Sequence, residues 1–395
     1  MDAPHDLESL QAELDRCVKC GLCLPHCPTY RLTGDEGDSP RGRIALMQGF
    51  DRGELPASER LLTHLDRCLT CRACETTCPS GVEYNKLLEI GRELIEQQLP
   101  RSWLQQLYRR LLIYSFSESR RVGLLLSIAR LFRPLLPAQL KKRIPLVVNT
   151  ADTRPRAQAR SMLLLDGCVQ PAAAPHINKL AIQVFDRLGI QLLTIAESGC
   201  CGALQHHLAD SEGARDRARS NIDAWWPVVE QGAEAIVVTA TGCTPMIKDY
   251  RHLLQDDEQY AERAQRISAM TKDLSEVLSR EDLSELSPNT SKRVAFHSPC
   301  SLQHAQKLDG VVESLLKQAG FTLVAVRDAH LCCGSAGTYS ILQPALSTQL
   351  RDNKLDRLQE KQPDLIATAN IGCLLHLQAK AKAPVIHWIE LLASG

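Results

Sequence analysis

Two stretches near the start of the chain share one cysteine spacing: Cys17-Val-Lys-Cys20-Gly-Leu-Cys23-Leu-Pro-His-Cys27-Pro28 and Cys68-Leu-Thr-Cys71-Arg-Ala-Cys74-Glu-Thr-Thr-Cys78-Pro79. In each stretch three cysteines lie two residues apart, so their thiols can face one centre from a tight loop. Thiolates are ligands for soft metal centres. The two stretches therefore predict a first domain that is organised around bound metal.

The spacing C-x2-C-x2-C-x3-C-P is the run that holds [4Fe–4S] clusters in bacterial ferredoxins. In ferredoxins with two such runs, the fourth cysteine of each run ligates the cluster of the other run. We therefore expect two clusters with crossed ligands. The first set is Cys17, Cys20, Cys23 and Cys78, and the second set is Cys68, Cys71, Cys74 and Cys27. A pair of zinc sites fits less well, because zinc ligands usually come as C-x2-C pairs separated by a longer loop.

Composition limits the classes of function. The chain has 395 residues, no net charge and 4% aromatic residues, so it offers neither a global basic charge nor a stacking surface for nucleic acid. The N-terminus lacks a basic region followed by an apolar run, and no apolar stretch reaches the length of a transmembrane helix. Sixteen cysteines without an export signal indicate metal ligands in a reducing compartment, so we expect a cytoplasmic protein.

A basic segment follows the first domain. Residues 101–146 contain ten Lys or Arg and a single acid, Glu118, and their apolar residues recur at helical spacing until Pro134 and Pro137. Such a segment can lie on an anionic membrane surface or on an acidic partner. It can equally be a connector with a solvated basic face.

The second half of the chain is an internal repeat. One copy has Cys168, Cys200, Cys201 and Cys243, and the other has Cys300, Cys332, Cys333 and Cys373. In both copies 31 residues separate the first cysteine from a Cys-Cys-Gly triplet. Each cysteine or pair follows a short apolar run that reads as a strand: 162–165, 190–195, 235–239, 294–296, 322–326 and 365–367. Helical periodicity over 174–188 and 213–230 separates the strands of the first copy.

Strands that alternate with helices predict a parallel sheet in each copy. The carboxyl ends of parallel strands form a ligand crevice, so the four cysteines of each copy are expected to converge there. They can hold a further iron–sulfur cluster, hold zinc, or remain free thiols. The expected fold is α+β, with a helical ferredoxin-like domain and two α/β cysteine-rich lobes. The expected boundaries are 1–100 for the di-cluster domain, 101–158 for the helical connector, 159–285 for lobe 1 and 286–395 for lobe 2.

The Cys-Cys-Gly motifs resemble the cysteine-rich domains of the heterodisulfide reductase catalytic subunit. The motif of that family ends in C-x2-C, whereas this chain has Met246 and His376 at the last position. Over nearly its whole length the chain resembles the iron–sulfur subunits of bacterial glycolate oxidases. The stretches that carry this resemblance include 64–71, 74–81, 221–226, 302–307 and 330–339.

This second resemblance implies an electron-transfer component of an oxidoreductase complex that acts on a CH–OH group. A partner subunit with FAD oxidises glycolate to glyoxylate, and the electrons pass through this chain to quinone or another acceptor, with peripheral contact to the inner face of the cytoplasmic membrane. The chain has no G-x-G-x-x-G fingerprint placed for FAD and no candidate catalytic residue, so substrate oxidation is assigned to the partner. Two alternatives remain: an iron–sulfur subunit for another 2-hydroxy acid such as D-lactate, and a thiol or disulfide enzyme like heterodisulfide reductase.

Overall fold

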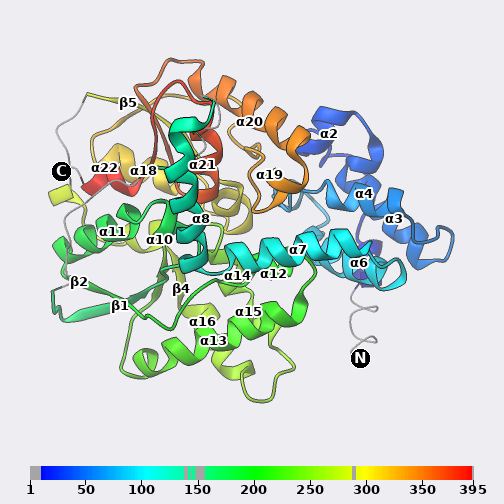
Figure 1. Ribbon diagram of the computed structural model, residues 1–395, viewed down its shortest axis with the longest axis horizontal. Helices are drawn as coiled ribbons and strands as arrows, with labels where there is room; N and C mark the ends of the chain where they lie inside the picture. The colour runs from blue at the N-terminus through cyan, green and yellow to red at the C-terminus, as the bar shows by residue number, and fades with distance from the viewer. Residues whose placement is uncertain (1–9, 138–140, 143, 147–155, 287–290, 394–395) are drawn as a thin grey trace. The chain divides into compact units, whose positions relative to one another are not determined.

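The computed structural model describes residues 10–137, 141–142, 144–146, 156–286 and 291–393. The chain divides into two compact units (Figure 1). The first contains residues 1–110 and 330–354, and the second contains residues 111–329 and 355–395. The helices α7 (Trp103–Phe116) and α20 (Pro344–Gln359) each continue from one unit into the other. The four sequence domains expected above stay a prediction.

The first unit is helical. Its further helical elements are α2 (Pro28–Thr33), η1 (Glu36–Asp38), α3 (Pro40–Asp51), α4 (Glu59–Asp66), α5 (Ala73–Thr76), α6 (Tyr84–Gln98) and α19 (Tyr339–Leu342). The expected helix at 40–50 is confirmed as α3: the Ser39 side chain accepts a hydrogen bond from the Gly42 amide, and Pro40 occupies the first turn. The expected helix before Cys68 is confirmed as α4.

A small apolar core holds these helices together. It includes Leu65, Leu87, Leu88 and Ile95, and four of the metal-binding candidates, Cys17, Cys68, Cys74 and Cys78, pack against it. The candidate ligands therefore line one edge of the core of this unit.

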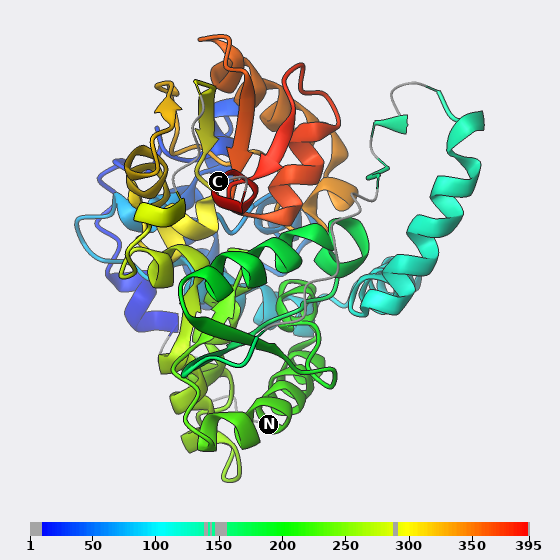
Figure 2. The same cartoon turned by 90° about the vertical axis from the view of Figure 1, so that its left-hand side faces the viewer.

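The second unit contains two four-stranded parallel sheets with the same strand order (Figure 2). The first has the order β2-β1-β3-β4, from β1 (Arg160–Leu164), β2 (Ile190–Thr194), β3 (Ile236–Val238) and β4 (Thr271–Asp273). The second has the order β6-β5-β7-β8, from β5 (Arg293–His297), β6 (Thr322–Leu323), β7 (Leu365–Thr368) and β8 (Val385–His387). The fold class, including the repeated parallel sheets, is confirmed. Strands β4 and β8 were not predicted, and β6 is shorter than the expected 322–326.

Helices connect the strands of the first sheet: α10 (Gln170–Ala173), α11 (His176–Arg187), α12 (Ala203–His207), α13 (Ser211–Glu230), α14 (Thr244–Lys248), α15 (Tyr250–Leu253), α16 (Ala261–Met270), α17 (Leu274–Leu278) and η3 (Ser284–Leu286). The second sheet has η4 (Ser301–Ala305), α18 (Val311–Gln318), α21 (Ile371–Gln378) and α22 (Ile389–Ala393). The predicted helices at 174–188 and 213–230 are confirmed as α11 and α13. Gly189 follows α11 in the left-handed region, as its place after the helix predicts.

The two sheets meet through equivalent segments. The Thr241 amide donates to the Ala369 carbonyl, the Gly242 amide donates to Asn370 Oδ1, and the Thr241 and Ser301 hydroxyls lie 2.8 Å apart. Residues 239–243 follow β3 and residues 368–373 follow β7, so each copy of the repeat presents the same strand end to the other.

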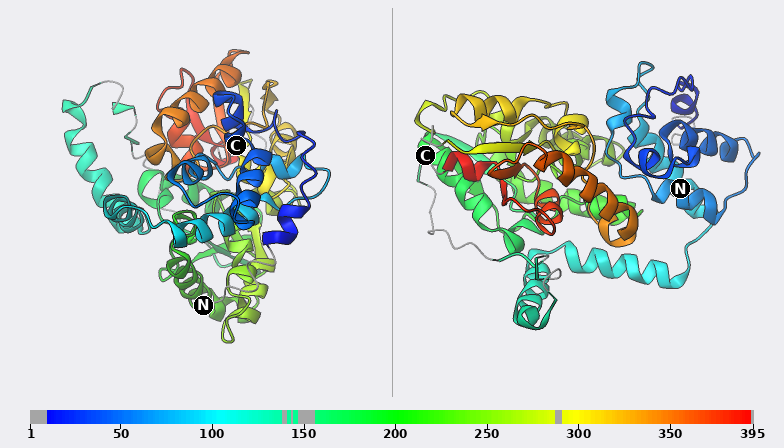
Figure 3. Two further views of the ribbon diagram at one scale, coloured as in Figure 1. Left: turned by 90° about the vertical axis from the view of Figure 1, so that its right-hand side faces the viewer. Right: turned by 90° about the horizontal axis from the view of Figure 1, so that it is seen from above.

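The basic segment forms α7 and α8 (Ser119–Phe132), followed by η2 (Arg133–Leu135), and can be followed in cyan and teal in Figure 3. Residues 147–155 of the expected connector lie outside the described residues. In the part of the chain that the structure describes, no helix is both long and apolar enough to cross a bilayer.

Candidate metal centres

The two cysteine runs form loops with the same backbone. Lys19 and Gly21 in the first run have positive φ angles of 56° and 87°, and Thr70 and Arg72 at the matching positions of the second run have angles of 51° and 60°. Non-glycine residues rarely adopt this conformation. Its occurrence at the same two positions in both runs indicates that these loops are shaped to direct thiols inward.

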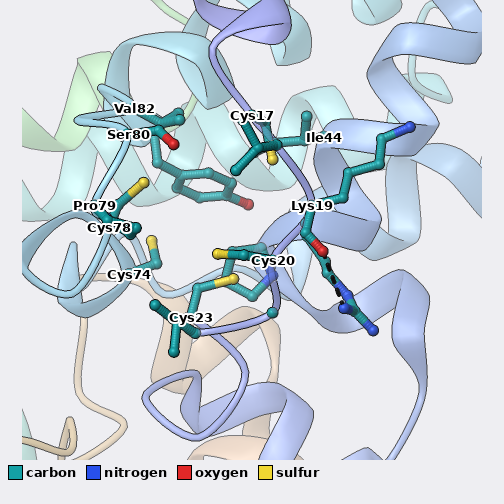
Figure 4. Close-up of a pocket in the computed structure, with 16 residues that line it drawn as sticks. Cys17, Lys19, Cys20, Cys23, Ile44, Cys74, Cys78, Pro79, Ser80 and Val82 are labelled. Carbon is teal, nitrogen blue, oxygen red and sulfur yellow. Dashed lines mark hydrogen bonds between the residues drawn. The ribbon is translucent and has the colours of Figure 1, made fainter.

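The first cavity of this unit is an open hollow of about 430 Å³, a volume that includes solvent at its mouth. Figure 4 shows thiols from both runs around this space. Its cysteines are Cys17, Cys20, Cys23 and Cys78, with Cys74 also in the wall. Cys78 thus lies with the first three cysteines of the other run, which is the grouping that crossed ligation requires.

The second cavity is a similar open hollow of about 310 Å³, solvent at its mouth included, and has the complementary cysteines, Cys27, Cys68, Cys71 and Cys74. Cys27 directly precedes α2, whose first residue is Pro28. The structure therefore brings together the two predicted ligand sets in two cavities that share Cys74 and Tyr84 in their walls. That each set ligates a cluster stays a prediction.

Spacing of the sulfur atoms indicates the size of the group that fits. A tetrahedral zinc site has sulfur atoms ~3.8 Å apart, given Zn–S bonds of about 2.3 Å. Within the described residues, no three of these eight thiols have their sulfur atoms within 4.8 Å of one another. Among the described residues, these eight thiols are therefore not already gathered around a point the size of a single ion.

A buried tyrosine is consistent with a bound cluster. The Tyr84 hydroxyl is buried and has no hydrogen-bond partner among the described residues, although Tyr84 lines both cavities. An unsatisfied buried donor costs about 1–3 kcal/mol. Sulfide and thiolate sulfur in a bound cluster would offer an acceptor to this hydroxyl.

Burial also affects the protonation of the thiols before metal binds. It raises the pKa of Cys23 to about 11 and, with the neighbouring Cys71 and Cys68, raises the pKa of Cys74 well above its usual value. Metal binding by Cys23 and Cys74 must therefore release their protons.

The four thiols of the first repeat also come together, after β1, β2 and β3. Cys200 accepts hydrogen bonds from the Cys168 and Cys201 thiols, and these hold its pKa well below the usual value. The Cys201 thiol also forms a hydrogen bond with Cys243. These hydrogen bonds, together with burial, raise the pKa values of Cys168 and Cys201. The expected convergence at the carboxyl ends of the strands holds for this copy.

Two residues that the motif search did not select fix this loop. Asn221 on α13 donates to the Cys200 carbonyl at 2.9 Å and accepts from the Gly199 amide at 2.9 Å. Tyr250 donates to the Cys201 carbonyl at 2.9 Å. In the sequence, Asn221 stands out only as a polar residue within the predicted helix and as the first residue of the stretch 221–226 that carries the family resemblance.

In the second repeat, unlike the first, the four cysteines are divided between the two compact units. Cys332 and Cys333 belong to the first unit, whereas Cys300 and Cys373 belong to the second. In the first unit the Gly334 amide donates to Cys332 Sγ at 3.4 Å, and in the second Asn370 donates to Cys373 Sγ at 3.6 Å. Convergence of these four thiols stays a prediction.

Comparison with known proteins agrees with these sites. The 4Fe-4S dicluster domain family matches residues 13–82, and the cysteine-rich domain family matches residues 162–248 and 294–378. The glycolate oxidase iron-sulfur subunit of Escherichia coli (strain K12) is 47% identical over 98% of this chain and 96% of that protein. A probable glycolate oxidase iron-sulfur subunit of Bacillus subtilis (strain 168) is 30% identical over 97% of this chain and 94% of its own length.

A third relative is shorter. Lactate utilization protein A of Exiguobacterium sp. (strain ATCC BAA-1283 / AT1b) is 24% identical over 58% of this chain and 95% of that protein. The two full-length matches decide the assignment, because they span both cysteine runs and both copies of the repeat. This chain is an iron–sulfur protein and belongs to the family of glycolate oxidase iron–sulfur subunits.

Proposed function

We propose that this chain is the electron-transfer subunit of a glycolate oxidase complex. A partner subunit with FAD oxidises the CH–OH group of glycolate to glyoxylate, and the electrons leave through this chain to a membrane quinone or another acceptor. The observation that carries the proposal is the pair of cysteine-lined cavities whose walls share Cys74 and Tyr84.

The stoichiometry of electrons suits this arrangement. Oxidation of glycolate to glyoxylate releases two electrons and two protons, whereas iron–sulfur clusters exchange electrons singly. When bound, the clusters supply two one-electron carriers side by side. Cys17, Cys20, Cys23 and Cys78 would hold one of them, and Cys27, Cys68, Cys71 and Cys74 the other.

The complex purified with its flavin subunit tests the proposal. With glycolate as donor, we expect reduction of a dye that accepts electrons from flavin to survive in Cys17→Ala, and reduction of a quinone analogue to be lost. Equal loss of both activities would contradict a pure electron-transfer role. The same assay with D-lactate in place of glycolate decides which 2-hydroxy acid the partner oxidises.

The disulfide-reductase alternative is weakened by Met246. This residue stands where the heterodisulfide reductase motif has its last cysteine, and it is buried in the core that includes Cys201, Trp225 and Tyr250. A thioether packed in an apolar core cannot form or reduce a disulfide.

The thiols of the first repeat form a further candidate metal site. Cys168, Cys200, Cys201 and Cys243 suit an additional iron–sulfur cluster or a zinc ion, and the matching site of the second repeat consists of Cys300, Cys332, Cys333 and Cys373. Anaerobic analysis of iron, acid-labile sulfide and zinc decides among them. About eight irons per chain would mean two cubanes alone, and about twelve would mean that a repeat holds a cluster as well.

The proposed acceptor places the complex at the inner face of the cytoplasmic membrane, and α7 and α8 suit contact with its surface. Large apolar side chains are exposed on both helices: Trp103, Leu104, Leu107, Tyr108, Leu111 and Tyr114 on α7, and Leu124, Leu125, Ile128, Leu131 and Phe132 on α8. Exposed Trp and Tyr are typical of the interfacial region of a bilayer. Ten basic residues against one acid in 101–146 favour anionic lipid.

Vesicle flotation tests this contact. We expect the complex to float with vesicles that contain anionic phospholipid, less so with neutral vesicles, and to lose binding in Leu124→Glu/Leu131→Glu. Leu55→Glu, at an exposed leucine outside these helices, serves as the matched control and should bind normally. Binding that is unaffected by the paired substitution would reject this surface and leave the electron-transfer proposal intact.

A further inference from the structure

Arg43 is a buried cation of the first unit in the wall of the second cavity. It is carried by α3, is 1% exposed and lines the second cavity. Its Nε donates to the His64 carbonyl at 2.6 Å, and its Nη2 donates to Thr29 Oγ1 at 3.2 Å. A fully buried guanidinium is expensive to desolvate, so its position calls for a functional explanation.

One hydroxyl connects this guanidinium to a candidate ligand. Thr29 Oγ1 donates to the Asp38 carbonyl at 2.9 Å and lies 3.2 Å from Cys27 Sγ. The pKa of Arg43 is raised despite burial, with contributions from Tyr84, Cys68 and Cys27. A single hydroxyl group, that of Thr29, therefore separates the charge of Arg43 from Cys27, a predicted ligand of the second cavity.

Asp38 does not cancel this charge. The carboxylate is fully buried and lies 3.0 Å from Arg67, 2.9 Å from His64 Nδ1 and 3.6 Å from Arg43. Two arginines share this single carboxylate, and the closer contact belongs to Arg67. Arg72, the other arginine in this wall, is paired with Glu75 at 2.7 Å. The charge of Arg43 is thus the one that leaves a net positive charge beside the second cavity.

The first cavity has a different electrostatic environment. Arg41 in its wall forms an ion pair with Glu36 at 2.7 Å, and the two side chains are 33% and 48% exposed. Water screens such a pair, so it contributes little field. Lys19 is the other cation in this wall, and it is exposed.

We infer that buried Arg43 raises the reduction potential of the cluster in the second cavity above that of the cluster in the first. The inference rests on the proposed function, in that it assumes two clusters in these cavities. Reduction adds one electron to a cluster, and a fixed positive charge in a low-dielectric wall stabilises the reduced form. An electron that enters the unit then comes to rest on the cluster held by Cys27, Cys68, Cys71 and Cys74.

The test is an anaerobic redox titration of the full-length chain, followed by EPR. Arg43→Met removes the charge and keeps most of the volume, Arg43→Lys keeps the charge, and Arg41→Met is the matched control. We expect Arg43→Met to weaken reduction of one cluster at least tenfold, which corresponds to about 59 mV for one electron. Arg43→Lys and Arg41→Met should each shift the potentials far less.

Iron content separates the outcomes. If Arg43→Met fails to assemble, Arg43→Gln also removes the charge but keeps an N–H donor for the His64 carbonyl, and a downward shift of one potential is still expected. Unchanged potentials in variants with full iron content, or an equal shift in Arg41→Met, would overturn the inference. A wild-type chain without two cubane signals would instead refute the di-cluster function itself.

Discussion

Tyr84 is the residue whose role depends most directly on what the cavities hold. Its hydroxyl lacks a partner among the described residues and lies in the wall of both thiol cavities. We expect Tyr84→Phe to retain its iron but to lower the reduction potential of at least one cluster, because a hydrogen bond to a charged acceptor is lost. The equilibrium constant for reduction of that cluster should fall by up to about tenfold.

Two measurements check this expectation: an EPR-monitored titration of the loaded protein and thermal unfolding of the metal-free protein. Without metal the hydroxyl is an unsatisfied buried donor, so Tyr84→Phe should be at least as stable as the wild type. Unchanged potentials together with lower metal-free stability would indicate that Tyr84 has only a packing role.

His387 makes the stability of the second unit depend on pH. Burial lowers its pKa to about 4, against an opposing effect of Glu390, and its Nε2 donates to the Thr239 carbonyl at 3.1 Å. The folded state therefore favours the neutral ring, and the unfolded state binds the proton first. The stabilisation is complete above about pH 6.5 and is lost as the pH falls towards 4, by on the order of 3 kcal/mol.

Chemical denaturation as a function of pH measures this effect. His387→Gln should flatten the loss of unfolding free energy between pH 6.5 and 4. The exposed His252 provides the control, and His252→Gln should keep the wild-type slope. An identical slope in all three proteins would show that His387 does not control the acid sensitivity.

At the scale of elements, one glycine fixes the approach of η1 to α3. A Cβ at Gly42 would collide with the backbone carbonyl of Glu36, which cannot move away as a flexible side chain can. We expect Gly42→Ala to lower the free energy of unfolding by about 1–3 kcal/mol. Thermal unfolding measures the loss, and iron content shows whether the neighbouring cavity still fills.

Gly123 is the matched control, since it also lies within a helix, α8, but a Cβ there would meet only Ala172 at an ordinary distance of 3.9 Å. Gly123→Ala should be neutral or stabilise by about 0.5–1 kcal/mol, because alanine favours helix more than glycine does. If both substitutions behaved alike, contact between η1 and α3 would not be the cause.

The elements that the sequence predicted well are those with strong periodicity or caps. Ser39-Pro40 predicted the start of α3, and Gly189 predicted the end of α11. Strands β4 and β8 were missed because each has three residues at a sheet edge, and Thr271-Lys272-Asp273 has little apolar character. Edge strands form because a neighbouring strand offers its backbone, and local sequence does not reveal this.

In the candidate site, too, the sequence predicted some residues and missed others. In the first unit, cysteine spacing was sufficient to predict which thiols lie together, because three thiols of each set come from one short loop and the doubled run predicts that the fourth comes from the other loop. Arg43, Tyr84, Asn221 and Tyr250 were not selected, since their relevance comes from burial beside residues that are distant in the sequence. Arg41 and Arg43 lie two positions apart, and from the sequence both can dock a partner or face solvent. That interpretation is wrong for Arg43, because the structure buries it and leaves Arg41 partly exposed.

At the scale of the whole molecule, the two units differ in what stabilises them. The first has a small core flanked by candidate ligands, whereas the second has two parallel sheets and a core that includes Trp225, Ile236 and Tyr250. Metal binding to such a ligand-lined unit is coupled to its folding. We expect removal of iron to unfold residues 10–98 largely and to leave the sheet of β1, β2 and β3 folded.

Hydrogen exchange with and without iron measures this difference. The amides of α3, α4 and α6 should lose protection on removal of iron, and those of β1 and β3 should keep it. Loss of protection in both units together would mean that the chain unfolds as one cooperative body.

The first unit also has an unusual chain course, because it includes residues 330–354. Within it, the Tyr339 hydroxyl donates to the Arg67 carbonyl at 3.1 Å, across 272 positions of sequence. On the ribosome, the cysteine runs emerge early, and the segment that completes their unit emerges among the last. The nascent chain therefore leaves the thiols open to the machinery that inserts iron and sulfide throughout most of translation, and the unit closes only when synthesis is nearly finished.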